Sequence, residues 1–284
     1  MKASTLANKF FAVALWNKLP AFLQKSISMV WAIVYRWKIS SLFIRFFCNR
    51  YELDSVQLEL YRPASGSKKY NSFQDFFTRQ LKHPVSAHVR DIISPCQGFV
   101  CENGWVTDFD KVEVKGRNYT VRDIFEQWGE KITSGYFFMN IFLHNHNYHR
   151  LHSPVSGTVA QIRNISGHLN FLRPWLYDRK SVSTPSFVNE RCMLEIVDAK
   201  ARSWFLTFVG GMGVGQIRIT EGLQVGSSVM AGDELGYFLL GSTCCIAAPV
   251  ELKKFGYLQK IDVGDSLLAN ELPVQLHGQL QARG

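Results

Sequence analysis

The sequence predicts an α+β protein that is mainly β, with an antiparallel core of the barrel or sandwich kind and amphipathic N-terminal helices at a membrane interface. Three observations lead to this fold class. Short apolar runs separated by Gly, Pro and Asn follow one another from about residue 89 onward. Bulky apolar residues and positive charge are combined in the first 50 residues. The composition, 46% hydrophobic and 19% charged over 284 residues, allows a sizeable core.

The first 50 residues carry the charge excess of the chain. They hold eight of the 32 Lys and Arg residues and none of the 23 Asp and Glu residues, so the remainder is close to neutral. The same segment contains the runs FFAVALW, ISMVWAIVY and SLFIRFF. A Lys or Arg recurs too often to leave the ~18–20 apolar residues that a spanning helix needs. Basic helices rich in Trp and Phe lie in the membrane interface, with their cations on anionic head groups.

Other interpretations of this segment stay open. It can pack as a helical layer on the rest of the protein with a solvated basic face. An acid-free, basic, amphipathic start also fits a mitochondrial presequence. A secretory signal peptide fits poorly, because FFAVALW is short and Asn17-Lys18 follows where small residues should stand. No nucleic-acid-binding motif accompanies the charge, so nucleic acid is not expected as a partner.

A further helix and a domain boundary follow. In NSFQDFFTRQL (71–81) the apolar side chains have helical spacing, with Ser72 as the N-cap. The pattern then changes to β. We therefore expect a helical membrane-associating segment, 1–82, and a β-rich domain, 83–284.

The β-rich domain is predicted from short apolar runs, with one helix around 121–128 between them. The runs are GFVCENGWV, KVEVKGRNYTV, YFFMNIFL, GTVAQIRNI, MLEIVDA, WFLTFVG, VGQIRIT and ELGYFLL. SPCQGFV (94–100) and SPVSGTV (153–159) repeat the pattern S-P-x-x-G-x-V, and AAPVELKKFG (247–256) is a looser third. The repeat is either recurring turn chemistry or a sign that equivalent turns lie at a common site.

The histidines and cysteines of the chain lack the spacing of known metal ligands. His144, His146, His149 and His152 lie within nine residues, but their spacing fits no finger or HExxH helix and no acid or Cys lies among them. The six cysteines show no zinc-ligand spacing and are predicted to be small buried residues in a reducing compartment. No metal site is expected.

The stretch YFLLGSTCCIAAP (237–249) resembles one buried strand interrupted by Gly241-Ser242-Thr243. A buried serine usually bonds a neighbouring carbonyl. As a nucleophile, Ser242 would need a base such as His, and Gly241 before it would remove steric hindrance. Attack on its own preceding carbonyl would turn the amide into an ester. Elimination would then leave dehydroalanine, which hydrolyses to an N-terminal pyruvoyl group.

Five blocks of the sequence together resemble phosphatidylserine decarboxylases. They are FQDFFTRQL (73–81), YHRLHSPVSG (148–157), FVNER (187–191), VGGMGVGQI (209–217) and GDELGYFLLGST (232–243). Their order and spacing match as well, and the resemblance covers roughly residues 8–268. Each block is weak alone, whereas five in the same order are specific.

The resemblance implies a self-cleaving proenzyme. Family members cut themselves before the serine of an L-G-S-T motif, so the expected cleavage site is Gly241–Ser242 and the products are chains 1–241 and 242–284. Ser242 becomes the pyruvoyl cofactor, which forms a Schiff base with the amine of phosphatidylserine and acts as the electron sink for loss of CO2. Hydrolysis then releases phosphatidylethanolamine.

The resemblance also implies roles for two histidines and one glutamine. In the Y-H-R-x-H motif the second histidine, His152, is the base for self-cleavage, and the first, His149, assists decarboxylation. The family turn S-P-x-D-G has an aspartate that orients the base, where this chain has Gln97. An amide can hold an imidazole tautomer but cannot stabilise imidazolium, and in the serine-protease triad the Asp-to-amide change costs about 10⁴ in rate. Gln97 is therefore expected to be a weaker orienter.

Two other functions stay open beside the decarboxylase. One is an uncleaved, catalytically inactive lipid-binding protein on a membrane surface, and the other is a pyruvoyl enzyme for another amino-acid head group. The expected partners are phosphatidylserine, an anionic membrane surface, the second chain of the same proenzyme and another copy of the protein as a homodimer. The expected location is peripheral, on the cytoplasmic face of the cell (inner) membrane, with the mitochondrial inner membrane as the alternative.

Overall fold

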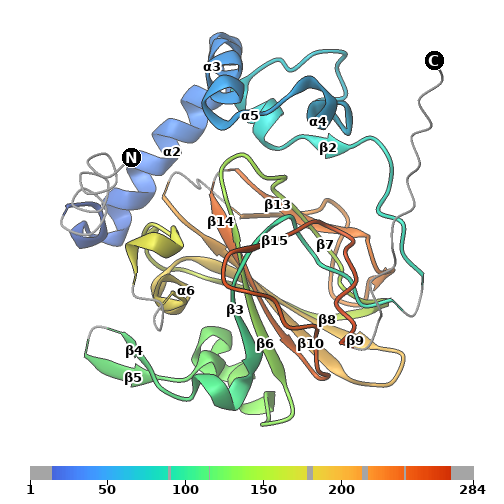
Figure 1. Ribbon diagram of the computed structural model, residues 1–284. Coiled ribbons are helices and arrows are strands. Elements are labelled where there is room, and N and C mark those ends of the chain that lie inside the picture. Colours follow the sequence, from blue (N-terminus) through green and yellow to red (C-terminus); the bar gives the residue numbers. More distant parts are fainter. Residues whose placement is uncertain are drawn as a thin grey trace.

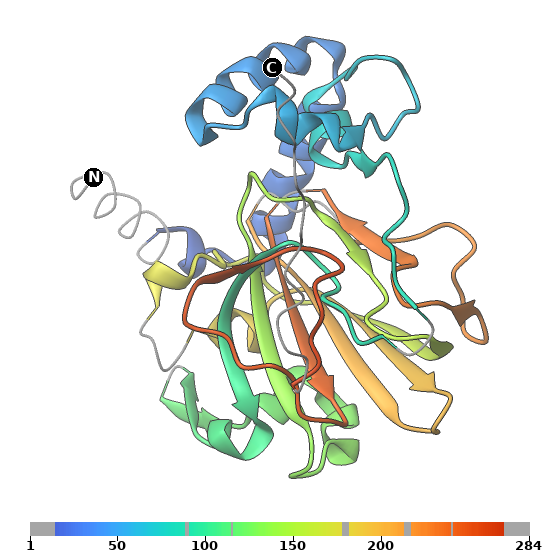
Figure 2. The same ribbon diagram turned by 45° about the vertical axis from the view of Figure 1, so that its right-hand side comes forward.

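A layer of N-terminal helices lies against one side of a β-sheet body (Figure 1). The computed structural model describes residues 15–88, 91–114, 116–177, 182–212, 217–239 and 241–269. The FFAVALW run falls mostly outside these residues, as do Leu240 and residues 213–216 of the VGGMGVGQI block. The predicted boundary between 82 and 83 stays a prediction. After a 45° turn the helices again lie above the sheets (Figure 2).

The predicted N-terminal helices are present in the described residues. Pro20 precedes the longest helix, where its fixed φ suits a helix start, and Trp37 ends that helix with extended backbone. The elements are η2 (Trp16–Lys18), α2 (Ala21–Arg36), η3 (Lys38–Ser41), α3 (Leu42–Tyr51), α4 (Ser55–Glu59) and α5 (Phe73–Phe77).

The helix predicted over 71–81 is shorter than expected. Its N-cap is correct, since the Ser72 side chain accepts a hydrogen bond from Asp75 N. The helix ends at Phe77 because Arg150 Nε binds the carbonyls of Thr78 and Arg79, at 2.9 and 3.1 Å. The chain then forms β2 (Gln80–Leu81), which pairs antiparallel with β1 (Tyr61–Arg62). A tertiary contact therefore overrides the local helical pattern.

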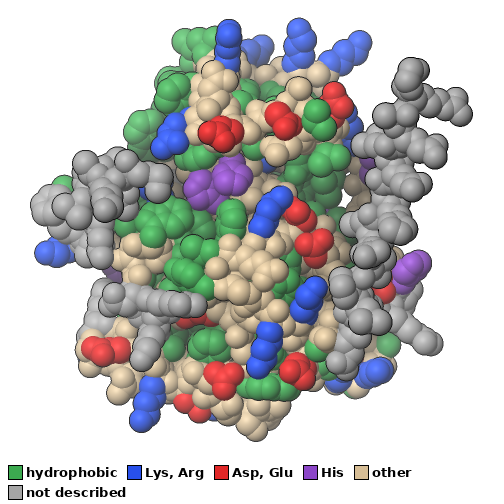
Figure 3. All heavy atoms as spheres, in the orientation of Figure 1, with side chains coloured by type: hydrophobic (Ala, Val, Ile, Leu, Met, Phe, Trp, Pro, Cys, Tyr) green, Lys and Arg blue, Asp and Glu red, His purple; other side chains and the backbone are tan. Residues whose placement is uncertain are grey.

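The helical layer is apolar on two sides. Towards the interior, Phe73, Phe76 and Phe77 of α5 are buried beside aromatic and aliphatic side chains of α2 and α3. Away from it, α2, η3 and α3 leave large apolar side chains exposed, and Figure 3 shows hydrophobic atoms and Lys and Arg side chains over the helical part of the molecule. The exposed set comprises Phe22, Leu23, Ile27, Met29, Val30, Trp31, Ile33, Trp37, Ile39, Leu42, Phe43 and Phe46.

No single helix among the described residues has the length and apolar composition to cross a membrane. The pair 21–36 and 38–51 satisfies that test jointly, with a bend of 83° between its two parts.

The β body confirms the predicted antiparallel core. Its main sheet has the order β12-β8-β9-β10-β14-β6-β3-β15, and a smaller sheet has the order β11-β13-β7. The strands of the main sheet are β12 (Ser228–Val229), β8 (Gly157–Ile165), β9 (Arg191–Asp198), β10 (Ser203–Gly210), β14 (Ser242–Ala248), β6 (Phe137–Leu143), β3 (Gly98–Trp105) and β15 (Gln259–Ile261). Those of the smaller sheet are β11 (Ile217–Ile219), β13 (Glu234–Phe238) and β7 (Arg150–His152).

Apolar side chains cover both faces of the main sheet. Along β10, Trp204, Leu206 and Phe208 belong to one buried cluster, whereas Phe205 and Val209 belong to another. This alternation is the period-two pattern of a strand buried on both faces. The second cluster is closed by the 3₁₀ helix η5 (Val121–Lys131), where the sequence predicts a helix around 121–128. The remaining elements are η4 (Val106–Phe109), β4 (Val112–Val114), β5 (Arg117–Tyr119), η6 (Pro174–Leu176) and α6 (Thr184–Val188).

The stretch 237–249 is not one interrupted strand, as its apolar pattern suggested. Strand β13 ends at Phe238 in the smaller sheet, and β14 begins at Ser242 in the main sheet. Residues 239–241 therefore connect two sheets. Gly241 and Ser242 lie where the chain enters the main sheet, at the edge of the core.

The repeated S-P-x-x-G-x-V turns lie against each other. His152 N donates to Pro95 O at 2.8 Å, and Ile93 N donates to Pro154 O at 3.0 Å, so the residue before each turn binds the proline of the other. The two serines, Ser94 and Ser153, each bond through their backbone to a Gly-Asp pair, 264–265 and 232–233 respectively, at 2.7 to 3.1 Å. The repeat is thus an internal pseudo-two-fold arrangement, and it brings His152 next to the second Gly-Asp pair.

Candidate active site

Ser242, the predicted nucleophile, lies in the buried part of the main sheet. It is fully buried as the first residue of β14, between Leu143 of β6 and Gly210 of β10. In the part of the chain that the structure describes, its Oγ has no hydrogen-bond partner. A buried hydroxyl without a partner is costly, which makes a chemical role for it more plausible than a structural one.

The carbonyl before Ser242 is already polarised. Gly211 N donates to Gly241 O at 3.2 Å. A side chain at 211 would bring a Cβ to 2.8 Å from Leu172 and 3.2 Å from that oxygen, so only glycine fits without a shift. Gly210 is fixed in turn, since Asn189 Nδ2 donates to its carbonyl at 2.8 Å. The VGG and FVNER blocks therefore place one backbone N–H on the oxygen that would become negative during attack.

His149 is a buried, neutral imidazole held in one tautomer. It is fully buried, and its Nδ1 lies 2.8 Å from Asn147 O, which requires the Nδ1–H tautomer. Among the described residues its Nε2 has no partner. Burial, first, and the charge of Arg79 lower its pKa well below the ordinary value, so the imidazole is neutral at pH 7. Phe238 N donates to His149 O, and Ser242 follows Phe238 by four residues.

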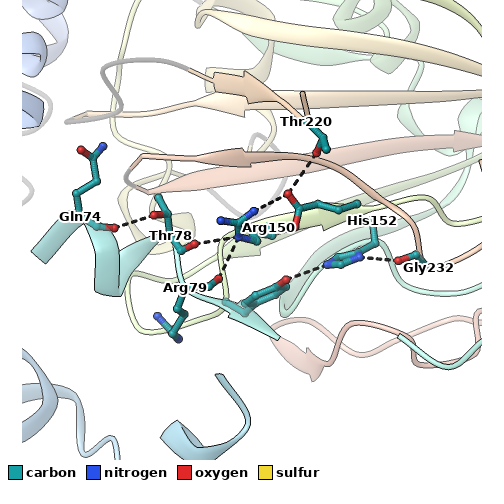
Figure 4. Close-up of polar contacts among 9 residues, drawn as sticks. Gln74, Thr78, Arg79, Arg150, His152, Thr220 and Gly232 are labelled. Carbon is teal, nitrogen blue, oxygen red and sulfur yellow. Dashed lines mark hydrogen bonds and ion pairs between the residues drawn. The ribbon is translucent and has the colours of Figure 1, made fainter. Parts of the chain in front are cut away.

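His152 is also neutral, but both of its ring nitrogens are engaged. Nδ1 lies 2.7 Å from Gly232 O, and Nε2 lies 3.1 Å from the Tyr148 hydroxyl, which therefore donates to it. Burial lowers the pKa of His152, partly offset by the Gly232 carbonyl and by Glu234. Figure 4 shows the contact of His152 with Gly232. His152 pairs with Glu234, at the start of β13, and so lies farther along this strand from Ser242 than His149 does.

Gln97 reaches His152 only through an intermediate residue. Its Oε1 accepts from Tyr148 N at 2.8 Å, and its Nε2 donates to Asp262 at 2.6 Å. The tautomer of His152 is set by Gly232 instead. The predicted role of Gln97 as orienter stays a prediction, but these contacts make it an indirect one, exerted through Tyr148.

A cavity of about 280 Å³ opens beside the Gly241 peptide. Its walls are largely apolar, and Arg173 is the cation among its described lining residues. The lining residues come from α2, from the end of β6 and from four connecting segments: Trp31, Tyr35, Phe142, Asn145, Phe171, Leu172, Arg173, Gly211, Met212 and Gly241. The cavity therefore lies between the N-terminal helices and the predicted cleavage site.

Several site residues were not found by sequence reasoning. Three of them come from separate segments of the chain: Gly211, Arg173 and Asn145. The Oδ1 of Asn145 lies 3.2 Å from where a Cβ on Gly241 would stand. Of these, only Gly211 left a sequence signal, because it stands in a Gly-Gly pair within a quoted block. The other two histidines of the 144–152 cluster, His144 and His146, contact each other with tilted rings beside Tyr51. No group of His, Cys, Asp and Glu suited to a metal ion is present among the described residues.

The chain is similar to known proteins over most of its length. The family model described as phosphatidylserine decarboxylase matches residues 73–269. A phosphatidylserine decarboxylase proenzyme of Psychrobacter arcticus is 31% identical over 237 residues, 76% of this chain and 80% of the relative. One from Bacillus mycoides is 27% identical over 242 residues, 82% of this chain and 86% of the relative. The matched range contains Ser242, His149, His152 and Gly241, and the chain belongs to the phosphatidylserine decarboxylase family of carboxy-lyases.

Proposed function

We propose that the protein cleaves itself between Gly241 and Ser242 and then converts phosphatidylserine to phosphatidylethanolamine and CO2 by means of a pyruvoyl group made from Ser242. The observation that carries the proposal concerns two neighbouring groups: a fully buried Ser242 hydroxyl with no hydrogen-bond partner among the described residues, and a Gly241 carbonyl that already accepts a hydrogen bond from Gly211 N. Both are needed for an attack of the serine on its preceding peptide.

Self-cleavage follows from these groups. The Oγ of Ser242 adds to the Gly241 carbonyl carbon while a neutral imidazole takes its proton, and Gly211 N–H stabilises the oxyanion. The C–N bond then breaks and the nitrogen takes a proton, which leaves an ester. Removal of the Ser242 α-proton expels the Gly241 carboxylate and leaves dehydroalanine. Hydrolysis releases ammonia and leaves the pyruvoyl group at residue 242.

The two histidines divide the proton transfers in this proposal. His152, with Nδ1–H on Gly232 and with its Nε2 accepting from the Tyr148 hydroxyl, serves self-cleavage. His149, whose Nε2 is free among the described residues, serves decarboxylation by accepting the ammonium proton of the substrate and returning it to carbon. The pyruvoyl group, when present, supplies an electrophilic carbonyl and an electron sink.

The cavity beside Gly241 suits an amphiphile with an anionic head group. Aromatic and aliphatic walls accept apolar chain, and Arg173 can pair with a phosphodiester through its planar fork of donors. Trp31 and Tyr35, which line the cavity, belong to α2, whose outer side is apolar and exposed. We propose that α2 and α3 lie on the anionic face of a membrane, so that lipid can enter the cavity from it.

The location follows from the same surface. A protein that docks by basic, apolar helices is peripheral, and we propose the cytoplasmic face of the cell membrane, with the mitochondrial inner membrane as the alternative. The large and small chains would stay together because β14 lies between β10 and β6 and pairs with six residues of β10 and seven residues of β6.

The function is tested by release of labelled CO2 from carboxyl-labelled phosphatidylserine in vesicles. The matured protein should release CO2 in proportion to phosphatidylethanolamine formed, and a reductant that traps Schiff bases should stop it. Cleaved protein that releases no CO2 from this lipid but does so from another amino-acid phospholipid would reassign the substrate. Protein that stays whole and binds vesicles would be the inactive lipid-binding homologue.

Docking by the helices can be tested separately from chemistry. Leu42→Asp with Phe46→Asp places two charges on α3, where these side chains are 75% and 70% exposed. Sedimentation with anionic vesicles should fall at least about tenfold, because each change removes apolar burial and adds repulsion. Self-cleavage should be unchanged. The matched control, Val225→Asp with Met230→Asp, alters exposed apolar side chains of the β body and should bind like the parent. Equal loss in both variants would contradict helix docking.

The missing family aspartate gives a further prediction. Gln97→Asp alone would set a carboxylate against Asp262, to which Gln97 now donates at 2.6 Å. The double variant with Asp262→Asn removes that repulsion, so we expect it to shorten the half-time of self-cleavage by about tenfold or more, since a carboxylate stabilises imidazolium. Electrophoresis of samples taken after synthesis measures the half-time. Asp262→Asn alone is the control, and a double variant no faster than it would refute a rate-limiting role for the missing charge.

A further inference from the structure

Arg79 is a buried cation that joins the helical layer to the loop between β6 and β7, residues 144–149, which is called the histidine loop below. It is 1% exposed and follows α5 by two residues. Its Nη2 donates to His146 O at 2.9 Å and to Asn147 O at 3.0 Å. Its backbone carbonyl and that of Thr78 are held by Arg150, as Figure 4 shows. The side chain is therefore fixed at both ends.

The charge of Arg79 is not neutralised by a carboxylate within the described part of the chain. The guanidinium instead lies over the rings of Tyr61 and Phe76, at 4.6 and 5.1 Å from their centroids. Burying a cation without an anion is expensive, even when aromatic faces and carbonyls compensate for part of the cost. An apolar side chain of similar size would serve simple packing better, so the position calls for another explanation.

Arg79 and His149 share one acceptor. Asn147 O accepts from Arg79 Nη2 and lies 2.8 Å from His149 Nδ1. The Phe77 ring packs against the imidazole in a tilted arrangement, with ring centroids 4.1 Å apart. The end of α5 thus fixes both the plane of His149 and the carbonyl that selects its tautomer.

We infer that Arg79 is a positioning residue for His149: by fixing Asn147 O, it keeps Nδ1 protonated and Nε2 free. The inference rests on the proposed decarboxylase function. It also links the proposed membrane-binding helices, α2 and α3, to catalysis. These helices pack on α5, and a shift of α5 would move Arg79 and the Phe77 ring together.

The electrostatic part has a definite sign. The charged and titratable groups facing His149 are Arg79, His144 and His146, and all three disfavour its protonation. Removal of the Arg79 charge must therefore raise the pKa of His149 towards its ordinary value. As the solution is acidified, an activity that requires neutral His149 would then be lost at a higher pH than in the parent protein.

The test uses Arg79→Met and Arg79→Lys in two backgrounds. In full-length Ser242→Ala protein, which makes no cofactor, NMR titration of labelled histidine should show a higher pKa for His149 in Arg79→Met and little change in Arg79→Lys. In matured protein, Arg79→Met should lower the kcat for phosphatidylserine about 10²-fold with KM nearly unchanged, and the acid limb of the pH profile should move to higher pH. Arg79→Lys should restore part of kcat and the original acid limb.

The control is Lys25→Met, which removes a cation that joins α2 to Glu190 without touching the histidine loop. It should alter neither the titration nor the pH profile. If the two Arg79 variants lose kcat equally and the pKa of His149 stays where it was, Arg79 is only a packing residue and the inference is wrong. If Arg79→Met does not fold, Arg79→Lys decides the case by itself. A kcat of Arg79→Lys as low as that of His149→Gln would also overturn the inference. Failure of the parent protein to cleave or decarboxylate would refute the proposed function instead, and the titration would still report on Arg79.

Discussion

Replacement of Ser242 by alanine should leave the chain intact at about its full 32.4 kDa under every condition in which the parent protein splits. The variant removes only the hydroxyl, and Ala fits the fully buried position at the start of β14. The loss should be complete rather than partial, because no other group can make the ester at this bond. Denaturing mass spectrometry after long incubation measures it, and CO2 release should be absent.

Thr243→Val is the matched control for that experiment. It removes the neighbouring hydroxyl, which is 4% exposed, and preserves the shape of the side chain. This variant should cleave at a rate close to that of the parent. Cleavage of Ser242→Ala, or a block in Thr243→Val, would place the nucleophile at another residue.

Substitution of the two histidines should separate maturation from turnover. His152→Gln should slow self-cleavage by about 10²–10⁴-fold, the usual contribution of a general base. His149→Gln should cleave at a normal rate but decarboxylate about 10²–10⁴-fold more slowly. Both effects follow from neutral imidazoles with Nδ1 protonated, one on Gly232 and the other on Asn147.

The half-time of self-cleavage and the turnover rate of protein that has already matured must be measured separately. His83→Gln, at an exposed position of the chain, is the control and should alter neither. The opposite outcome would be informative as well, because His149 Nε2 has no partner within the described ranges and the His149 carbonyl accepts a hydrogen bond from Phe238 N. If His149→Gln blocks cleavage and His152→Gln does not, the roles that family resemblance implies are exchanged in this protein.

The strands were the most predictable part of the fold. The run GTVAQIRNI coincides with β8. Its two ends could be predicted because turn-forming residues flank the run on both sides. Periodicity could not show that 237–249 joins two sheets, since buried strands of either sheet have the same apolar pattern. Nor could it show that Arg150, far along the chain, would end the helix at Phe77.

The candidate site residues were predicted where they stand in motifs. Ser242, Gly241, His149 and His152 were named in this way, and their roles stay predictions; the structure places the two histidines in or beside β7, which pairs with β13, and Ser242 at the start of β14. The partners of Gln97 could not be predicted, because Asp262 is 165 residues away in sequence. Backbone donors such as Gly211 N–H carry no sequence signature beyond their glycines. The role inferred for Arg79 depends on a carbonyl shared with His149, which only the folded chain shows.

The most direct measurement of the central claim is the mass of the fragments of purified protein, before and after treatment with ammonia and cyanoborohydride. The account predicts a chain ending at Gly241 and a chain beginning at residue 242 whose N-terminus lacks an amine. Reductive amination should convert that N-terminus to alanine and make it sequenceable. A second chain that begins with an unmodified serine, or protein that remains in one piece, would contradict a pyruvoyl group made from Ser242.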